Sequence, residues 1–335
     1  AVGDVFLLGT HAWRVVRVEQ SSVRVVDAEG AEPSVPFWFG ESPARTWELS
    51  QAVSRLYEEL SDPLTLRDAV AAKAQLTAIP GVSAEAAEQT VTFLSASLDA
   101  LGVLPSQRCI VIERFFDETG STQLVLHTPF GARVNRALGL ALRKRFCVTF
   151  DFELQAAADD DAITIALGPH HSMELSTIMP MVRPATFRGV LEQAVLPLPM
   201  LKTRWRWNGV RSLVINRTSS GARRPIQWIR MDADDLMAAV WPSLAACQEN
   251  APAGPIPIPE HVLVRQTLRD VFFEPLDVDS LERVLQGVDS GAIAVHTVDT
   301  PTPSPLAQGI LTGRPYTFLD DAPLEERRSR AVSLD

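Results

Sequence analysis

The chain has 335 residues, of which 46% are hydrophobic and 21% are charged, and its formal net charge is −10. This composition is typical of a globular protein with a large core, so it excludes a disordered chain. The longest apolar runs are far shorter than a bilayer span, which excludes transmembrane helices and a membrane partner. From the length we expect two or three domains.

Cysteine usage bears on the compartment. Cys109, Cys147 and Cys247 are widely spaced and form no C-x-x-C pair. The spacing therefore predicts neither a zinc knuckle nor a disulfide framework. Three free thiols suit a reducing environment, so we expect a cytoplasmic protein. The sequence begins at Ala1 without an initiator Met, which suggests a piece of a longer chain or a processed product.

The first forty residues predict a β-rich module followed by an aromatic loop. Residues 5–8, 13–18 and 23–27 are rich in β-forming side chains, with turn-like breaks between them. Short strands joined this tightly predict an antiparallel meander that closes as a small barrel. Trp38 follows in a proline-bounded loop, where it is either a plug in the core or a stacking platform for a base.

Residues 41–104 predict a helical segment. Apolar residues recur there at three-four spacing, and Ser42-Pro43 marks the start of a helix, with Ser as the cap and Pro in the first turn. The expected helices are 43–60, 64–77 and 83–102.

Three consecutive aspartates mark a turn in the strand-rich segment that follows. Asp159, Asp160 and Asp161 could bind a metal, but no further ligands lie at loop spacing, so a solvated turn is preferred. His170-His171 lacks the H-E-x-x-H arrangement, so no metal site is predicted there either. The expected strands of this segment are 109–116, 122–128, 150–157 and 162–167.

Residues 127–146 predict a helix with a basic face and an apolar face. Pro129 and Gly131 mark its start. At about 100° per residue, the basic residues fall within roughly one quadrant and the apolar ones on the other side. Such a helix either presents a solvated face or packs on a core and binds a polyanion. Its candidate residues are Arg133, Arg136, Arg143 and Lys144.

No acidic residue occurs between Glu192 and Asp232, although this run holds eight basic residues. In an acidic protein, such a run predicts a polarised surface or a basic channel. The expected helix 198–207 alternates arginine and tryptophan, a composition that binds phosphates and stacks on bases. The alternative is that both tryptophans are buried and the arginines pair with acids. The candidate residues are Lys202, Arg204, Trp205, Arg206 and Trp207.

The C-terminal part is expected to be mostly helical. Helices at 260–273 and 277–288, followed by a strand at 291–299, match the order of a winged-helix module. We therefore predict an α+β fold, with a small antiparallel β-barrel-like module plus mixed α/β and winged-helix-like helical parts. The expected domains are 1–40, 41–104, 105–200 and 201–335.

Sequence motifs of common enzymes are absent. The chain contains no phosphate-binding P-loop, no G-x-S-x-G elbow and no G-x-G-x-x-G turn. Glu113 and Asp117 flank a strand end, where we expect them to pair with arginines instead of performing acid–base catalysis. The sequence thus favours a binding module over a complete enzyme, and it predicts no catalytic residue.

Several long strings resemble the region downstream of the motor in the Lhr (large helicase-related) family, including its DEAD/H-associated domain. The resemblance extends over nearly the whole chain. It is carried by residues 3–9 (GDVFLLG), 13–14 (WR), 36–38 (PFW), 40–41 (GE), 48–50 (ELS), 113–118 (ERFFDE), 127–146, 152–156 (FELQA), 203–208 (TRWRWN) and 318–328 (FLDDAPLEERR).

This resemblance implies a parent that is an ATP-dependent 3′-to-5′ helicase acting on DNA and on RNA:DNA hybrids. Its two RecA-like domains and a winged helix would precede Ala1, and ATP and Mg would bind there, so no cofactor is expected in this chain. The chain would be the last domain of the helicase core, clamping the tracking single strand. Its partners would be that strand, the helicase's own other domains and a nuclease or repair protein.

The resemblance also implies that one tryptophan stacks on a base of the bound strand. By position the match is Trp38, with Trp205 and Trp207 as the alternatives. The domain is similar to glycosylases that unhook DNA crosslinks, but their Gln-x-Gln motif is absent from this sequence. A glycosylase-like repair module and a protein-interaction domain remain the two alternative functions.

Overall fold

A computed structural model describes residues 2–8, 11–19, 22–28, 31, 44–117, 120–150, 154–168, 173–245, 254–311 and 319. The chain divides into a smaller unit, Ala1–Pro43 with Asn216–Met231, and a larger unit, Ala44–Ile215 with Asp232–Asp335. The predicted α+β class is confirmed. No helix within the described ranges combines the length and the apolar character of a membrane span.

The smaller unit contains an antiparallel meander in the order β1-β2-β3. Its strands are β1 (Val5–Leu8), β2 (His11–Val18) and β3 (Val23–Asp27), so the three predicted strands are confirmed. Val5, Ala12 and Ala28 form its small core. In the described residues β1 and β3 pair only with β2, so the sheet is open. Three strands this short do not close a barrel, which needs more strands and a fixed stagger.

The larger unit is built on a five-stranded sheet in the order β10-β4-β5-β7-β6. The central strands are buried apolar runs because both faces of the sheet are covered. Neighbouring strands are antiparallel, except that β10 runs parallel to β4. The strands are β4 (Cys109–Phe116), β5 (Thr122–His127), β6 (Gln155–Ala158), β7 (Ala162–Gly168) and β10 (Ala294–Asp299).

The pairing of β10 overturns the winged-helix expectation. Helix α9 (Val262–Phe273), helix α10 (Val278–Asp289) and β10 do follow one another in the predicted order. However, β10 pairs with β4 along its full length, from Ala294 opposite Cys109 to Asp299 opposite Arg114. The strand therefore completes the main sheet and does not form the wing of a separate module.

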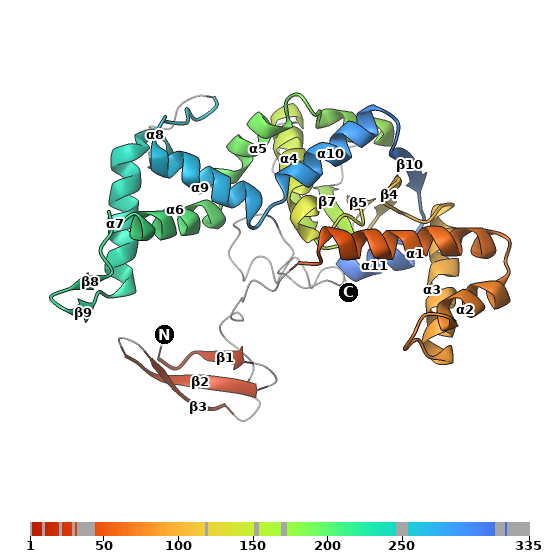
Figure 1. The fold of residues 1–335 in the computed structure, drawn as a ribbon, viewed down its shortest axis with the longest axis horizontal. Helices are drawn as coiled ribbons and strands as arrows, with labels where there is room; N and C mark the ends of the chain where they lie inside the picture. Colours follow the sequence, from red (N-terminus) through yellow and green to blue (C-terminus); the bar gives the residue numbers. More distant parts are fainter. Residues whose placement is uncertain are drawn as a thin grey trace. The chain divides into compact units, whose positions relative to one another are not determined.

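Helices cover both faces of the sheet. Successive residues of a strand point to opposite faces. On β7, Ala162 packs with α11 (Pro305–Leu311), whereas Ile163 lies beside Gly139 of α4 (Ala132–Phe150). Helices α4 and α11 thus lie on opposite faces. Figure 1 shows α5 (Phe187–Val195) and α10 beside α4, which packs against both.

A three-helix layer precedes the sheet in the chain. It consists of α1 (Trp47–Thr65), α2 (Ala69–Thr77) and α3 (Ala84–Leu101). Helix α3 ends at Gly102, which adopts a left-handed conformation. The predicted start at Ser42-Pro43 lies outside the described residues. Helix α1 begins at Trp47, because Thr46 Oγ1 accepts a hydrogen bond from Leu49 N at 3.2 Å.

The remaining helices lie in the second half of the chain. Helices α6 and α9 pack against each other. Helix α6 spans Pro199–Arg211, close to the predicted 198–207. The other elements of this part are η1 (Leu175–Thr177), η2 (Met179–Met181), α7 (Ile226–Val240) and α8 (Pro242–Ala245).

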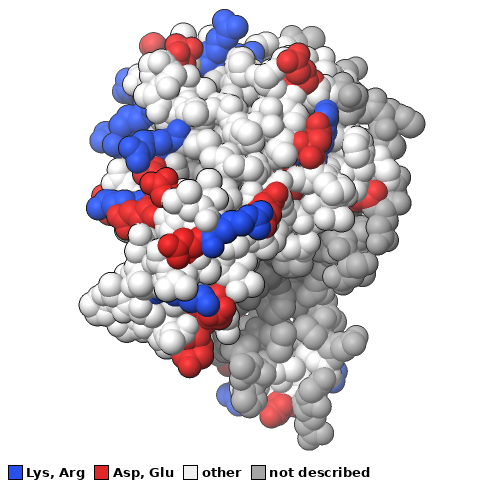
Figure 2. Space-filling model, turned by 90° about the vertical axis from the view of Figure 1, so that its right-hand side faces the viewer, with Lys and Arg blue, Asp and Glu red and all other residues white. Residues whose placement is uncertain are grey.

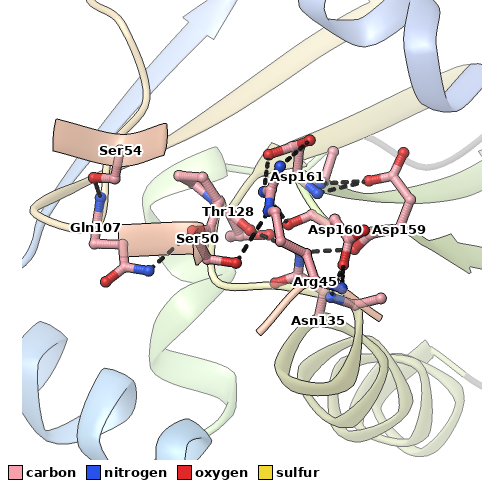
Figure 3. Close-up of polar contacts among 12 residues, drawn as sticks. Arg45, Ser50, Ser54, Gln107, Thr128, Asn135, Asp159, Asp160 and Asp161 are labelled. Carbon is pink, nitrogen blue, oxygen red and sulfur yellow. Dashed lines mark hydrogen bonds and ion pairs between the residues drawn. The ribbon is translucent and has the colours of Figure 1, made fainter. Parts of the chain in front are cut away.

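The turn between β6 and β7 holds the first turn of α4 (Figure 3). Asp160 Oδ1 accepts a hydrogen bond from Ala132 N at 2.8 Å, which satisfies an amide at the helix start. Asn135 Nδ2 donates to Thr128 O at 2.7 Å and to Asp159 O at 2.9 Å. Burial raises the pKa of Asp159, while hydrogen bonds from two backbone amides of its own turn oppose this.

Arg45 ties the same turn to the start of α1. Its guanidinium pairs with the Asp161 carboxylate and donates to Asp160 O at 3.1 Å, and its Nε donates to Ser50 Oγ at 3.1 Å. Gly131 is required beside it, since an added Cβ would lie 3.0 Å from Arg45 O. The turn predicted to be solvated is therefore only partly so. The three aspartates are half-buried and join α1, α4 and the sheet.

We predict that Asp160→Ala lowers the free energy of unfolding by about 1–3 kcal/mol, because it leaves the amides of Ala132 and Arg45 without their acceptor. Urea unfolding of the chain measures the loss. Asp99→Ala is the matched control, because its ion pair with Arg67 is exposed and should contribute less than about 1 kcal/mol. Equal losses in the two variants would contradict the structural role of the turn.

Glu113 is fully buried on β4 and accepts four hydrogen bonds. His127 Nε2 and Ser304 Oγ donate to Oε2 at 2.8 and 2.7 Å, and Ser304 N and Thr300 Oγ1 donate to Oε1 at 2.7 and 2.9 Å. The prediction that Glu113 pairs with arginine is wrong, because its ionisable partner is a histidine. Ser304 also accepts from Ala307 N at 3.3 Å, so the carboxylate anchors the start of α11 to the sheet.

These contacts make the stability of the chain depend on pH. Burial alone would raise the pKa of Glu113, but the hydrogen bonds from His127 and Ser304 outweigh it and hold that pKa below its ordinary value. A carboxyl group with a lowered folded-state pKa stabilises the fold above its unfolded pKa of about 4.3. That contribution is lost as the pH falls through the folded-state pKa.

We predict that Glu113→Gln lowers the free energy of unfolding by about 1–3 kcal/mol at neutral pH, because the donors at one carboxylate oxygen then face an amide NH2 group instead of an acceptor. The gap in free energy of unfolding between wild type and variant should then narrow as the pH falls below about 4.3. Urea midpoints measured across this range test it, with the exposed Glu59→Gln as control. A gap that does not change with pH would rule out an ionised Glu113 in the fold.

Candidate nucleic-acid interface

Arg133, at the start of α4, is bound inside the protein. Its Nη2 donates to Phe273 O at 2.6 Å and to Leu276 O at 3.0 Å. Both carbonyls lie at the end of α9 or just after it, in the turn to α10 (residues 273–277, the α9–α10 turn). A cation at the carboxyl end of a helix satisfies its last carbonyls and the helix dipole. Arg133 therefore holds the scaffold together.

Arg204, on α6, contacts the same turn from another helix. Its side chain is 3% exposed, and its Nε lies 3.5 Å from Glu274 Oε2. The guanidinium also lies over the ring of Trp207, 4.9 Å from its centroid. The two basic segments predicted from the sequence thus meet at the α9–α10 turn. At this meeting point their charges bind protein groups, so Arg204 does not fit the predicted role in binding phosphate.

Trp205 belongs to the core. It is 1% exposed, and its Nε1 donates to Ala233 O at 2.9 Å. Asn208, one turn further along α6, donates to Asp270 Oδ2 of α9 at 2.8 Å. The buried face of α6 therefore includes polar residues, which hide its helical periodicity in the sequence. A base cannot stack on so buried an indole, so the prediction for Trp205 does not fit its position.

Five of the predicted residues remain at the surface of the larger unit. Lys202 and Lys144 are exposed, Arg206 and Arg136 are half-buried, and Trp207 is 39% exposed. Arg143 is also half-buried, and its Nε donates to Leu154 O at 3.1 Å. Trp38 lies outside the described residues. The candidate residues of the larger unit that reach solvent, together called the α4/α6 surface here, are Arg136, Lys144, Lys202, Arg206 and Trp207.

The acid-free run also includes surface residues that were not among the candidates predicted from the sequence. They lie in the smaller unit, in the hairpin of β8 (Thr218–Ser219) and β9 (Ala222–Arg223) and in the first turns of α7. The lack of acids from 193 to 231 was the signal for them. The exposed members are Arg217, Arg223, Trp228 and Arg230.

Around α1, α2 and α3, unlike in the acid-free run, basic and acidic side chains are mixed on the surface. Figure 2 views the side that lies at the right of Figure 1, and blue and red groups adjoin one another on it. Ion pairs there join Lys73 to Glu88 and Arg108 to Glu58. Within the described ranges, no cluster of three or more metal-binding side chains occurs. Mixed charge of this kind keeps a surface hydrated and gives no field that would attract a polyanion.

The family model described as DEAD/H associated matches residues 104–307, which is more than half of the chain. The chain belongs to the DEAD/H-associated family. The predicted resemblance to Lhr helicases is confirmed by the relatives and by a solved structure.

Two bacterial relatives of this DEAD/H-associated chain match it end to end. The Lhr helicase/uracil glycosylase of Escherichia coli (strain K12) is 27% identical over all of this chain, which covers 20% of that protein. The Lhr helicase/probable uracil glycosylase of Mycolicibacterium smegmatis is 29% identical over 99% of this chain, which covers 21% of it. The chain thus spans about a fifth of these relatives.

An archaeal relative and a solved structure also match this chain. The ATP-dependent helicase Lhr-Core of Sulfolobus acidocaldarius is 21% identical over 95% of this chain, which covers 35% of it. A solved structure of the Mycobacterium smegmatis helicase Lhr bound to ssDNA and AMP-PNP matches 85% of this chain, with a TM-score of 0.63 and 25% identity. The matched part is 34% of that chain.

We predict that Arg133→Ala destabilises this DEAD/H-associated region, whereas Lys144→Ala on the same helix does not. Losing the two hydrogen bonds to the α9–α10 turn should lower the free energy of unfolding by about 1.5–3 kcal/mol. The exposed Lys144→Ala should stay within about 0.5 kcal/mol of wild type. Denaturant unfolding compares the two. An Arg133→Ala variant as stable as Lys144→Ala would show that the arginine does not support the scaffold.

Proposed function

We propose that the chain is the nucleic-acid-binding region of an Lhr-type ATP-dependent helicase and that it holds a single strand on its α4/α6 surface. The observation that carries this proposal is the match to the solved Lhr structure bound to ssDNA, which extends over 85% of this chain. The exposed basic residues on α4 and α6 support it, because single-strand binding depends on cations that track the phosphates.

The chemistry of the α4/α6 surface suits a strand without sequence preference. Lys144 and Lys202 are exposed ammonium groups, and each can neutralise one phosphate. Trp207 offers an aromatic ring to a base, and the guanidinium of Arg204 over that ring holds it in place. A ring fixed before binding loses little entropy when a base stacks on it. Trp38, outside the described residues, is proposed as a further stacking residue on the basis of the family resemblance.

The helicase cycle requires parts that this chain lacks in sequence. It contains no P-loop, so ATP and Mg would bind in RecA-like motor domains of the parent protein. In the proposal, this region clamps the tracking strand while the motor moves 3′ to 5′ on DNA or on an RNA:DNA hybrid. A clamp of this kind prevents backward slip between ATP hydrolysis events, and the RecA-like and winged-helix domains are its partners.

A glycosylase activity is the second candidate, favoured by the names of the two bacterial relatives. It is tested by incubating the chain with uracil-containing single-stranded DNA without ATP and measuring strand cleavage after alkali. Cleavage would support the glycosylase. Intact DNA together with salt-sensitive binding would support the clamp.

We predict that Lys144→Ala with Lys202→Ala makes binding of a labelled oligothymidylate weaker and less dependent on salt. Each lost phosphate contact should reduce the slope of log affinity against log salt by roughly 0.7. Trp207→Ala and Trp38→Ala should each cost about 1–3 kcal/mol of binding free energy. Fluorescence anisotropy across a salt series provides both values.

The control for this experiment is Lys73→Ala on α2, since that lysine pairs with Glu88 away from the proposed strand. It should leave affinity and salt slope unchanged. Binding that is absent or does not respond to salt would reject the clamp and favour a protein-interaction domain. An equal effect of Lys73→Ala would place the strand elsewhere on the chain.

A further inference from the structure

The β8–β9 hairpin and the start of α7, within Asn216–Met231 of the smaller unit, form an exposed feature that we call the basic hairpin. Thr218 pairs with Arg223 and Ser219 with Ala222, so the turn has only two residues. These residues, Ser220 and Gly221, both have positive φ, at 51° and 81°. This is the tight turn whose twist matches a two-stranded hairpin.

Arg224 fixes the base of the basic hairpin. Its backbone amide donates to Arg217 O at 2.9 Å, and its Nη1 donates to Asn216 O at 3.1 Å. These bonds close the hairpin where the two strands would otherwise separate. Two strands of two residues each have little stability of their own. The added bonds therefore stabilise the backbone of the hairpin.

The charge of the basic hairpin has no acidic counterpart in its own segment. Arg217, Arg223 and Arg230 are exposed, and no Asp or Glu occurs from 193 to 231. Over the described part of the chain, no ion pair involves these three side chains. Clustered like charges repel and do not stabilise a fold, so they indicate a polyanionic ligand.

Trp228 adds an aromatic surface to this cationic cluster. It lies in the first turn of α7 and is 58% exposed, while its neighbour Ile229 is buried. The helix thus buries Ile229 and leaves the indole in solvent, in the same short segment as the exposed arginines. An exposed aromatic ring among cations is the arrangement that single-stranded nucleic acids use, since each base offers a ring face for stacking.

We propose that the basic hairpin is a second contact for single-stranded nucleic acid, with Trp228 stacking on a base and Arg217, Arg223 and Arg230 binding phosphates. The inference rests on the proposed function and extends it to a site that neither predicted basic helix contains. Single-stranded nucleic acid fits better than a duplex, because stacking on Trp228 requires a base with an open face. An acidic protein segment would satisfy the arginines but leave the indole unused.

The test measures binding of a labelled oligothymidylate to the full chain by anisotropy. We expect Trp228→Ala to weaken binding about tenfold, within the range of one lost stacking contact. Trp228→Phe should retain most of the affinity, because it keeps an aromatic face. Arg217→Ala and Arg223→Ala should each flatten the salt slope by roughly 0.7. Gln227→Ala, at an exposed neighbour, is the control and should bind like wild type.

The outcomes separate the two proposals. If Lys144→Ala with Lys202→Ala weakens binding but Trp228→Ala does not, the basic hairpin is not a contact and the α4/α6 surface stands. If the wild-type chain does not bind the oligonucleotide, both proposals are overturned. Competition by poly-glutamate as strong as by unlabelled oligonucleotide, with no effect of Trp228→Ala, would identify an acidic protein partner and reject the inference.

Discussion

The fold of the larger unit depends on how three adjacent carboxylates are satisfied. Asp160 accepts the amide at the start of α4, Asp159 accepts amides of its own turn, and Asp161 binds Arg45 before α1. Half-buried carboxylates are costly unless each oxygen has a donor. Here the donors come from the first residue of α4, from Arg45 ahead of α1 and from the turn itself. The same contacts that satisfy the charges therefore fix where α1 and α4 begin relative to the sheet.

A second constraint divides the basic residues into two groups. Arg133 and Arg204 bind the α9–α10 turn, whereas Lys144 and Lys202 on the same helices face solvent. Guanidinium groups suit the first task, because they offer several donors in a fixed plane and lose less hydration on burial. Ammonium groups suit the second, since they stay hydrated until a phosphate approaches. Of these four residues, the two arginines therefore support the scaffold and the two lysines face solvent.

Much of the local structure could be predicted, and much of the tertiary arrangement could not. The β-forming side chains and turn-like breaks of β1, β2 and β3 and the three-four spacing in α3 are local signals, and they located these elements. The pairing of β10 with β4 joins residues far apart in sequence and leaves no local signal. The burial of Arg204 and Trp205 could not be predicted either, because buried polar residues such as Asn208 interrupt the apolar stripe of α6. Only the acid-free run pointed to the basic hairpin, and its exposed Trp228 required the structure.

The parallel pairing of β10 with β4 has a consequence for how the polypeptide acquires its structure. Most strands of the sheet are close in sequence and can associate early, but β10 must close a loop that includes every helix from α4 to α10. Contacts of such high sequence separation form slowly, because chain entropy is lost before they are made. During synthesis, the edge of β4 that pairs with β10 stays unpaired until β10 has left the ribosome. The nascent chain therefore has a period in which that edge is open to aggregation or to a chaperone.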